Sequence, residues 1–216
     1  ALGNLASSIA LGLALTAIGL IAPARAATPP LRIIAAAPDK TALAQLAPLR
    51  VALGNLPGVG STTASWQDAD VAVVLGGPGR QGEPETAALR AFLRSGKGVV
   101  VLAASADAWP SEPKFESEIL GATRKGPFAD GAPMTIINLF PHPILTGVAS
   151  YETNQSIPHF EKLSDDVQII MEGTVGEATA PMAWVRRRHD GRMCHIVPGD
   201  SAAFADSTYQ RLVGQA

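Results

Sequence analysis

Four polar side chains in predicted loops are of types that could take part in chemistry. They are the carboxylates of Asp107, Glu152 and Asp200 and the imidazole of His142. If they converge, such groups could bind sugar hydroxyls, support a metal ion or act as an acid–base pair. Because the sequence does not fix their separations, it leaves these uses open. It predicts neither a metal site nor a bound cofactor.

Two further candidates, Ser105 and Trp109, lie on either side of Asp107. Ser105 follows a predicted buried strand, as a nucleophile would, but it lacks the G-x-S-x-G frame of a nucleophile elbow. Trp109 could stack on a sugar ring or fill space beneath its loop. The predicted ligand-binding residues are Ser105, Asp107, Trp109, His142, Glu152 and Asp200. The predicted catalytic candidates are His142, Glu152 and Asp200.

The histidines and the lone cysteine also have structural alternatives. His142 lies between two prolines that would stiffen its loop, and its ring could instead hydrogen-bond to the backbone. His189 adjoins a predicted turn, and His195 lies within a strand pattern as a core or surface residue. Cys194 lies in the same strand pattern, which favours a place in the core over a role as nucleophile.

A short apolar strand is expected to position the first group of candidates. Residues Val99–Leu102 form an all-apolar run after Gly96 and Gly98, which is typical of a strand buried on both faces of a sheet. Ligands of open α/β sheets bind beyond the carboxyl ends of the strands. We therefore expect the segment Ala103–Trp109 to border a site.

The order of the predicted elements gives the fold class. Strands near residues 31–37, 70–75 and 99–102 alternate with helices near 40–54 and 83–95, which is typical of α/β proteins. Three short strands follow near 167–171, 182–186 and 193–197, with a helix from about 204. Asp190-Gly191 predicts a hairpin between the last two strands. We predict a doubly wound, mostly parallel sheet flanked by helices, of flavodoxin-like type, with a C-terminal β-hairpin.

The N-terminal residues predict export. Residues 9–22 are apolar and uncharged, and Ala24-Arg25-Ala26 has the small-X-small pattern of a cleavage site. A membrane anchor and a buried helix are the alternatives, but the run is shorter than the roughly 20 residues of a spanning helix. We expect a signal peptide at 1–26, one domain at 27–216 whose natural C-terminus lies further on, and a secreted or periplasmic location.

Composition narrows the classes of partner. The 216 residues carry a net charge of −2, so nothing favours binding to nucleic acid or, after signal cleavage, to a membrane surface. The run Arg186-Arg-Arg188 is interpreted as an exposed hairpin face. With one cysteine, the chain can form no internal disulfide and no thiol cluster for zinc.

From residue 70 to 213, several motifs together resemble the ThuA-like (trehalose-utilisation) family of the class I glutamine amidotransferase-like superfamily. The first match is Gly96-Lys-Gly98 with its strand, Asp107-Ala-Trp109 and Ile119-Leu-Gly-Ala122. The second is His142-Pro-Ile-Leu-Thr-Gly-Val148, similar to the family's HPI-x-x-G-L loop. The third runs from Trp184-Val-Arg through Gly191-Arg-Met to Phe204.

The chain also departs from the pattern of that family. Ala103 stands where members often have a histidine, and Gly199-Asp200 replaces Gly-His. The acidic D-E-x-Y loop corresponds to Tyr151-Glu-Thr-Asn154, which keeps only Glu152. Glutamine amidotransferases need a cysteine after the central strand, where this chain has Ala104-Ser-Ala106. The resemblance therefore implies no glutaminase activity.

Two functions are compatible with this resemblance. The first is an exported domain that binds or acts on a carbohydrate or sugar derivative. The alternative is a non-catalytic module that binds a ligand or partner on the same fold. Whether the chain is an enzyme and how it oligomerises are left open.

Overall fold

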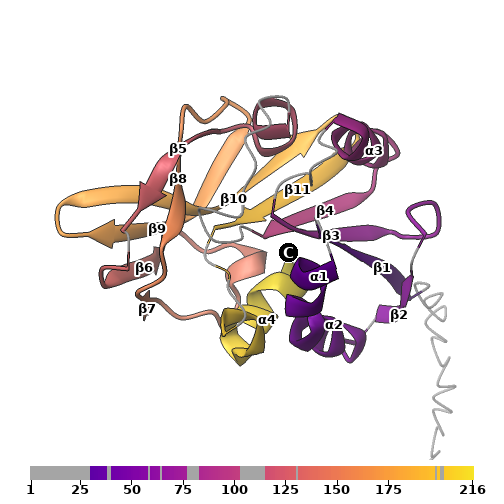
Figure 1. Ribbon diagram of the computed structural model, residues 1–216, viewed down its shortest axis with the longest axis horizontal. Helices are drawn as coiled ribbons and strands as arrows, with labels where there is room; N and C mark the ends of the chain where they lie inside the picture. Colours follow the sequence, from indigo (N-terminus) through magenta and orange to yellow (C-terminus); the bar gives the residue numbers. More distant parts are fainter. Residues whose placement is uncertain are drawn as a thin grey trace, which may run out of the picture.

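The protein has a nine-stranded sheet with helices on both of its faces (Figure 1). The computed structural model describes residues 30–37, 40–57, 59–63, 65–76, 83–102, 115–129, 131–197, 199 and 202–216. The strands are β1 (Leu31–Ala36), β2 (Val59–Thr63), β3 (Val71–Leu75), β4 (Gly98–Leu102), β5 (Thr123–Phe128), β6 (Met134–Asn138), β7 (Tyr151–Thr153), β8 (Ile157–Glu161), β9 (Val167–Val175), β10 (Ala178–Arg188) and β11 (Gly191–Ile196). The helices are α1 (Lys40–Gln45), α2 (Ala47–Gly54), α3 (Glu83–Arg94), α4 (Ser207–Gln215), the π-helix η2 (Phe115–Leu120) and the 3₁₀ turns η3 (Pro143–Leu145) and η4 (Ala203–Ala205).

The main sheet is mixed, so the prediction of a mostly parallel sheet was wrong. Its order is β2-β1-β3-β4-β11-β10-β9-β6-β7. The four pairings from β2 to β11 are parallel. The four pairings from β11 to β7 are antiparallel. Alternating strands and helices predicted the first half, whereas the strands of the second half follow one another without long helices and pair antiparallel.

Helices cover the two faces of the sheet in separate groups. Figure 1 shows α1, α2 and α4 together on one face, where α2 contacts α4. On the other face α3 contacts η2, and the two-stranded β5–β8 sheet lies beside them. The α/β class with flanking helices is therefore confirmed.

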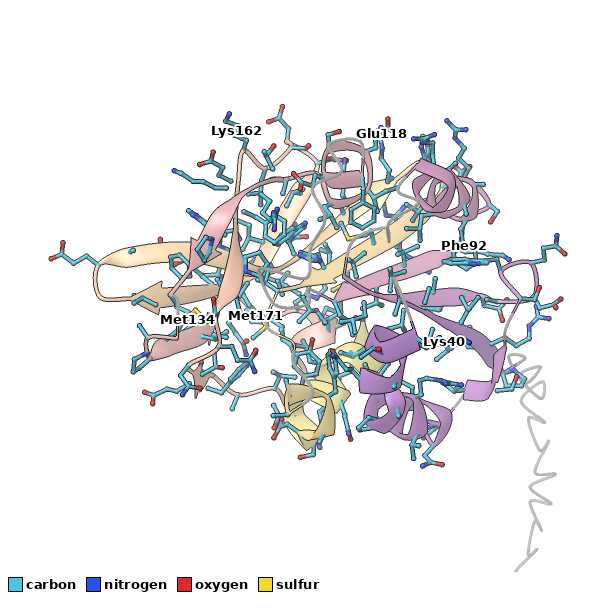
Figure 2. All side chains as sticks on the ribbon, in the orientation of Figure 1. Lys40, Phe92, Glu118, Met134, Lys162 and Met171 are labelled. Atoms are coloured by element: carbon cyan, nitrogen blue, oxygen red, sulfur yellow. The ribbon has the colours of Figure 1, made fainter. Side chains whose placement is uncertain are left out.

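The apolar run that the sequence singled out forms β4, which lies next to the central strand β11. The side chains of Val99, Val100, Val101 and Leu102 in β4 are all buried. In the side-chain view of Figure 2, Phe92, Met134 and Met171 are labelled, and all three belong to the core. Burial of this kind is the dominant favourable contribution to folding, at about 25 cal/mol per Å² of apolar surface.

The hairpin turn lies one residue earlier than the Asp190-Gly191 pair that the sequence predicted. Arg188 pairs with Gly191, so the two-residue turn is His189-Asp190, and His189 takes the left-handed φ of 55°. A Cβ on Gly191 would lie 2.6 Å from the carbonyl oxygen of Leu93 and 2.7 Å from that of Lys97. The glycine is therefore required by close backbone packing. Both strands belong to the main sheet, and η4 and α4 follow them.

An arginine beside this hairpin is buried, in contrast to the exposed face expected for residues 186–188. The Arg186 guanidinium forms a bidentate ion pair with Asp166, with its Nη2 2.7 Å from Oδ2 and 2.9 Å from Oδ1. Its Nη1 donates to the carbonyl oxygens of Ile119 and Ser117. Gly121, in the left-handed region at φ 69°, leaves room for the guanidinium. The Leu-Gly-Ala and Trp-Val-Arg segments thus meet in one structural contact.

Candidate functional site

Two of the six predicted ligand-binding residues, His142 and Glu152, lie among the residues that the structure describes. Ser105, Asp107, Trp109 and Asp200 lie outside the described residues, as does the expected border segment from residue 103 to 109. The test that the sequence suggested, convergence of the carboxylates with His142, is therefore limited to His142 and Glu152.

His142 has the structural role that its loop allowed. It is the N-cap residue of η3, and its Nδ1 accepts a hydrogen bond from the backbone N–H of Ile144 at 3.3 Å. Its half-buried ring meets Phe140 edge-on, with ring centroids 6.3 Å apart. Capping satisfies a backbone donor that the turn leaves unpaired. His142 is not among the described residues that line the cavity considered next.

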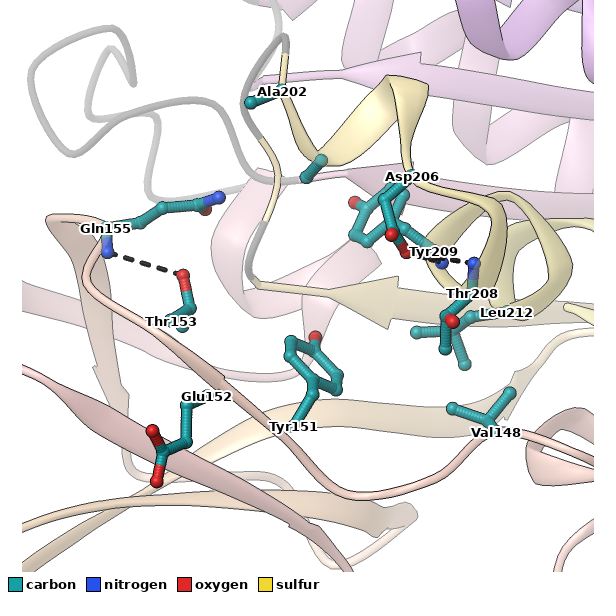
Figure 3. Close-up of a pocket in the computed structure, with 11 residues that line it drawn as sticks. Val148, Tyr151, Glu152, Thr153, Gln155, Ala202, Asp206, Thr208, Tyr209 and Leu212 are labelled. Carbon is teal, nitrogen blue, oxygen red and sulfur yellow. Dashed lines mark hydrogen bonds between the residues drawn. The ribbon is translucent and has the colours of Figure 1, made fainter.

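A cavity of about 310 Å³ lies between β7 and the beginning of α4 (Figure 3). This volume is at the lower end of the range of about 300–1,000 Å³ for small-molecule sites. Its walls come from the loop before β7, from β7 itself and from the segment that follows the carboxyl end of β11. The lining residues are Val148, Tyr151, Glu152, Thr153, Gln155, Ala202, Ala203, Asp206, Thr208, Tyr209 and Leu212.

Glu152 lines this cavity, as a predicted site residue, but at its edge. The residue is exposed. In Figure 3 its carboxylate points away from the side on which the Tyr151 ring lies, because successive side chains of a strand point to opposite faces. Thr153, on the same face as Tyr151, accepts a hydrogen bond through Oγ1 from the backbone N–H of Gln155 at 3.4 Å.

The side chain of Tyr151 forms part of the cavity wall and carries a buried hydroxyl. Its hydroxyl is buried and has no hydrogen-bond partner among the described residues. Burial raises the pKa of this phenol well above its ordinary value, and the negative charge of Asp206 raises it further. The hydroxyl therefore stays protonated, and a ligand oxygen could accept its proton in a hydrogen bond.

Asp206 forms the opposite wall and begins α4. Its Oδ1 accepts hydrogen bonds from the backbone N–H groups of Thr208 at 2.8 Å and Tyr209 at 2.9 Å. This is the arrangement of a helix N-cap, and it fixes the carboxylate at the cavity wall. The adjacent Tyr209 is buried and packs against Phe204, with ring centroids 5.7 Å apart.

Among the cavity residues that sequence reasoning missed are Tyr151, Asp206 and Tyr209. Asp206 had a local signal, because an aspartate directly before a helical pattern is a typical N-cap. The two tyrosines had none, since an aromatic residue in a helix or short strand is usually a core residue. The cavity thus combines aromatic rings with hydroxyl, amide and carboxylate groups, a set suited to a polyhydroxylated ligand.

The thiol of Cys194 and the imidazole of His195 are core groups. Cys194 is buried in β11, and burial raises the pKa of its thiol to about 12, so the core interpretation is confirmed. His195 is fully buried, with its Nδ1 3.0 Å from the carbonyl oxygen of Val101. Burial lowers the pKa of His195 to about 3, against the opposing effect of that hydrogen bond.

The described part of the chain lacks two features, a cluster of metal ligands and a membrane-spanning helix. Within it, no group of three His, Cys, Asp or Glu side chains is arranged to hold a metal ion. None of its helices is both long enough and apolar enough to cross a membrane.

Comparison with protein families assigns the chain. Residues 57–216 match the ThuA family, described as trehalose utilisation. The chain belongs to the ThuA family. The match covers the whole cavity and every motif that carried the resemblance. No curated protein matches this ThuA-family chain.

Solved structures share the fold at low sequence identity. A putative ThuA-like protein from Parabacteroides merdae is 13% identical with a TM-score of 0.63, over 86% of this chain and 88% of its own. The carbohydrate deacetylase Agd3 is 14% identical with a TM-score of 0.57, over 86% of this chain and 32% of its own. The exo-β-1,4-mannosidase Op5Man5 from an Opitutaceae bacterium is 15% identical with a TM-score of 0.58, over 87% of this chain and 35% of its own. The region that shares the fold of this chain is about a third of the length of each of these two larger enzymes.

Proposed function

We propose that this ThuA-family domain binds a carbohydrate or sugar derivative in the cavity between β7 and α4. The observation that carries the proposal is the pairing of the buried Tyr151 hydroxyl, which has no hydrogen-bond partner among the described residues, with the fixed Asp206 carboxylate across a cavity of about 310 Å³. The family description, trehalose utilisation, supports a sugar as ligand. The occurrence of the same fold within a carbohydrate deacetylase and a mannosidase agrees with it.

The two walls would contact a sugar in complementary ways. A sugar hydroxyl could accept the hydrogen bond of Tyr151 and so remove the cost of leaving that group unpaired, about 1–3 kcal/mol. Asp206 uses Oδ1 for the helix, which leaves Oδ2 to accept from a second sugar hydroxyl. Gln155 and Thr208 add amide and hydroxyl groups at the margin of the same cavity.

Thiol-based glutaminase activity is not part of this proposal. The segment after β4 contains Ala104-Ser-Ala106 and no cysteine. The lone Cys194 is buried with a raised thiol pKa, whereas a nucleophilic cysteine needs a thiolate that reaches the substrate.

Binding can be tested by thermal shift and calorimetry with neutral monosaccharides and disaccharides, trehalose among them. A ligand that binds only the folded state raises the unfolding midpoint in a dose-dependent way. The Tyr151→Phe variant removes only the hydroxyl and should weaken a sugar hit about 3- to 10-fold, the effect of one hydrogen bond. Glu177→Gln, in the exposed β9–β10 turn, is the matched control.

The outcomes separate the two functions that the sequence left open. A dose-dependent shift that Tyr151→Phe weakens and Glu177→Gln leaves unchanged supports the carbohydrate site. Folded protein that shows no shift with any sugar would refute the proposal and favour a module that binds a protein partner.

Export also remains a proposal for this chain. It depends on the apolar residues 9–22 and the small-residue pattern at Ala24-Arg25-Ala26. Expression of a chain that includes residues 1–26, followed by N-terminal sequencing of the extracytoplasmic product, should give Ala27 as the first residue. A product retained in the cytoplasm with residues 1–26 intact would refute export.

A further inference from the structure

We infer that the cavity between β7 and α4 selects neutral sugars and rejects sugars that carry a carboxylate or phosphate. The inference rests on the proposed carbohydrate site and deepens it by defining the charge of the ligand. It follows from the charges on the cavity wall, from the position of the nearest arginine on α4 and from the occupant of the helix N-terminus.

The first argument is the set of ionisable side chains around the cavity. Among the described lining residues, Glu152 and Asp206 are acidic, and none is a lysine, arginine or histidine. Among these described lining residues an anionic ligand meets no cation, and it lies near the carboxylate of Asp206, whereas the carboxylate of Glu152 points away from the side on which the Tyr151 ring lies. Like charges at close range repel, so the Asp206 carboxylate opposes the binding of an anionic ligand.

The arginine of α4, Arg211, lies next to a lining residue in sequence but does not face the cavity. Arg211 precedes the lining residue Leu212, but its guanidinium is turned to the loop after η3. There its Nη1 donates to the carbonyl oxygen of Gly147 at 3.3 Å. Arg211 does not line the cavity.

The third argument concerns the N-terminus of α4, which would otherwise attract an anion. Free backbone N–H groups and the helix dipole make such ends suitable for phosphates and carboxylates. Here the Asp206 carboxylate already accepts from the N–H groups of Thr208 and Tyr209. The protein's own anion thus occupies the position that a ligand anion would take.

A neutral sugar meets none of these obstacles. Its hydroxyls can donate to the carboxylate of Asp206 and accept from the hydroxyl of Tyr151, whose proton has no other acceptor among the described residues. The same carboxylate that repels an anion is therefore a good acceptor for a neutral polyol. Charge selection and sugar binding come from one side chain.

The experiment compares matched pairs of probes by calorimetry at pH 7. Glucose is compared with glucuronate and galactose with galacturonate, which differ in the oxidation of one carbon and the resulting charge. The uronate is expected to bind about tenfold more weakly than its parent, or worse, at low salt. The ratio of the uronate Kd to the Kd of its parent sugar should decrease as added salt screens the repulsion.

Two isosteric variants identify the source of the selection. Asp206→Asn removes the charge and keeps an oxygen that can cap α4, since Asn and Asp are about equally good N-caps. Glu152→Gln removes the charge at the edge of the cavity. Asp206→Asn should narrow the ratio of the two affinities by several-fold and Glu152→Gln should narrow it less, whereas Glu177→Gln, in the exposed β9–β10 turn and not a lining residue, should leave it unchanged.

Different experimental outcomes would refute the proposed carbohydrate site and the charge selection. If neither member of any pair binds, the carbohydrate site itself is refuted. If a uronate binds as tightly as its parent sugar, the site stands and the charge selection is overturned. If the uronate is weaker but neither variant changes the ratio, the selection does not come from these carboxylates and the inference is wrong.

Discussion

The buried histidine of β11 should make the stability of the fold depend on pH in a defined window. His195 is fully buried, donates from Nδ1 to Val101 and packs against the rings of Trp184 at 4.3 Å and Phe160 at 5.1 Å. Its pKa is lowered from 6.5 to about 3 by burial. Well above pH 6.5 the ring is neutral in both the folded and the unfolded chain, so it contributes no pH dependence there.

Below pH 6.5 the unfolded chain binds a proton that the folded chain does not. Stability therefore falls as the pH falls from about 6.5 towards 3, with a limiting slope of about 1.4 kcal/mol per pH unit. The two pKa values give a loss of about 1.4 kcal/mol in the free energy of unfolding between pH 7.5 and pH 5.5. That interval lies above the usual range of Asp and Glu titration.

The measurement is urea unfolding followed by tryptophan fluorescence at pH 7.5, 6.5 and 5.5. The His195→Gln variant cannot titrate but can still donate to Val101, so its unfolding free energy should change much less with pH. His189→Gln, in the exposed turn, is the control and should behave like the wild type. If the wild type and His195→Gln lose equal stability between pH 7.5 and pH 5.5, the reasoning is refuted.

Three further substitutions test contacts that define the fold, each by urea unfolding at pH 7.5. Arg186→Met leaves the carbonyl oxygen of Ile119 without its donor and should cost about 2–4 kcal/mol, and a cost under about 1 kcal/mol would contradict the buried ion pair. Gly191→Ala places a Cβ 2.6 Å from the carbonyl oxygen of Leu93 and should cost about 1–3 kcal/mol, whereas a neutral result would mean that the backbone moves apart freely. Asp206→Ala should cost about 1 kcal/mol through loss of the cap, while Asp206→Asn should be nearly neutral, and equal costs would argue against capping.

The parallel half of the fold could be predicted because its signals are local. The apolar run at Val99–Leu102, bounded by glycines, forms the buried strand β4, and the helical pattern from Glu83 forms α3. The extent of the antiparallel half could not be predicted, because strand pairing such as that of β6 with β9 depends on packing between distant segments. Periodicity identifies a strand but does not name its neighbour.

The hairpin illustrates how a tertiary contact overrides a turn signal. Asp190-Gly191 is a strong local pattern, yet Gly191 is needed at the beginning of β11, where the backbone of Leu93 and Lys97 approaches. His189 accepts the left-handed conformation instead. Nothing in the residues around the turn reveals the element that packs against it.

The candidate site was predicted only in part. Glu152 was identified from the sequence and lines the cavity. The direction of its carboxylate, away from the side on which the Tyr151 ring lies, depends on the register of β7, which the sequence does not give. His142 was identified as a candidate with a capping alternative, and the capping role is the one observed. Tyr151 and Asp206 gain their importance from a meeting of β7 with α4 that the sequence pattern does not encode.

The strand β11 has a consequence for the order in which the chain can fold during synthesis. It pairs in parallel with β4 and antiparallel with β10, so it joins the two halves of the sheet. His195 and Val101, neighbours across this joint, are separated by 94 positions in sequence. While the ribosome adds those residues, β4 has an open edge of unpaired backbone groups, the kind of edge that recruits strands from other molecules. Until β11 is synthesised, the nascent chain therefore exposes this edge of β4 to pairing with other molecules.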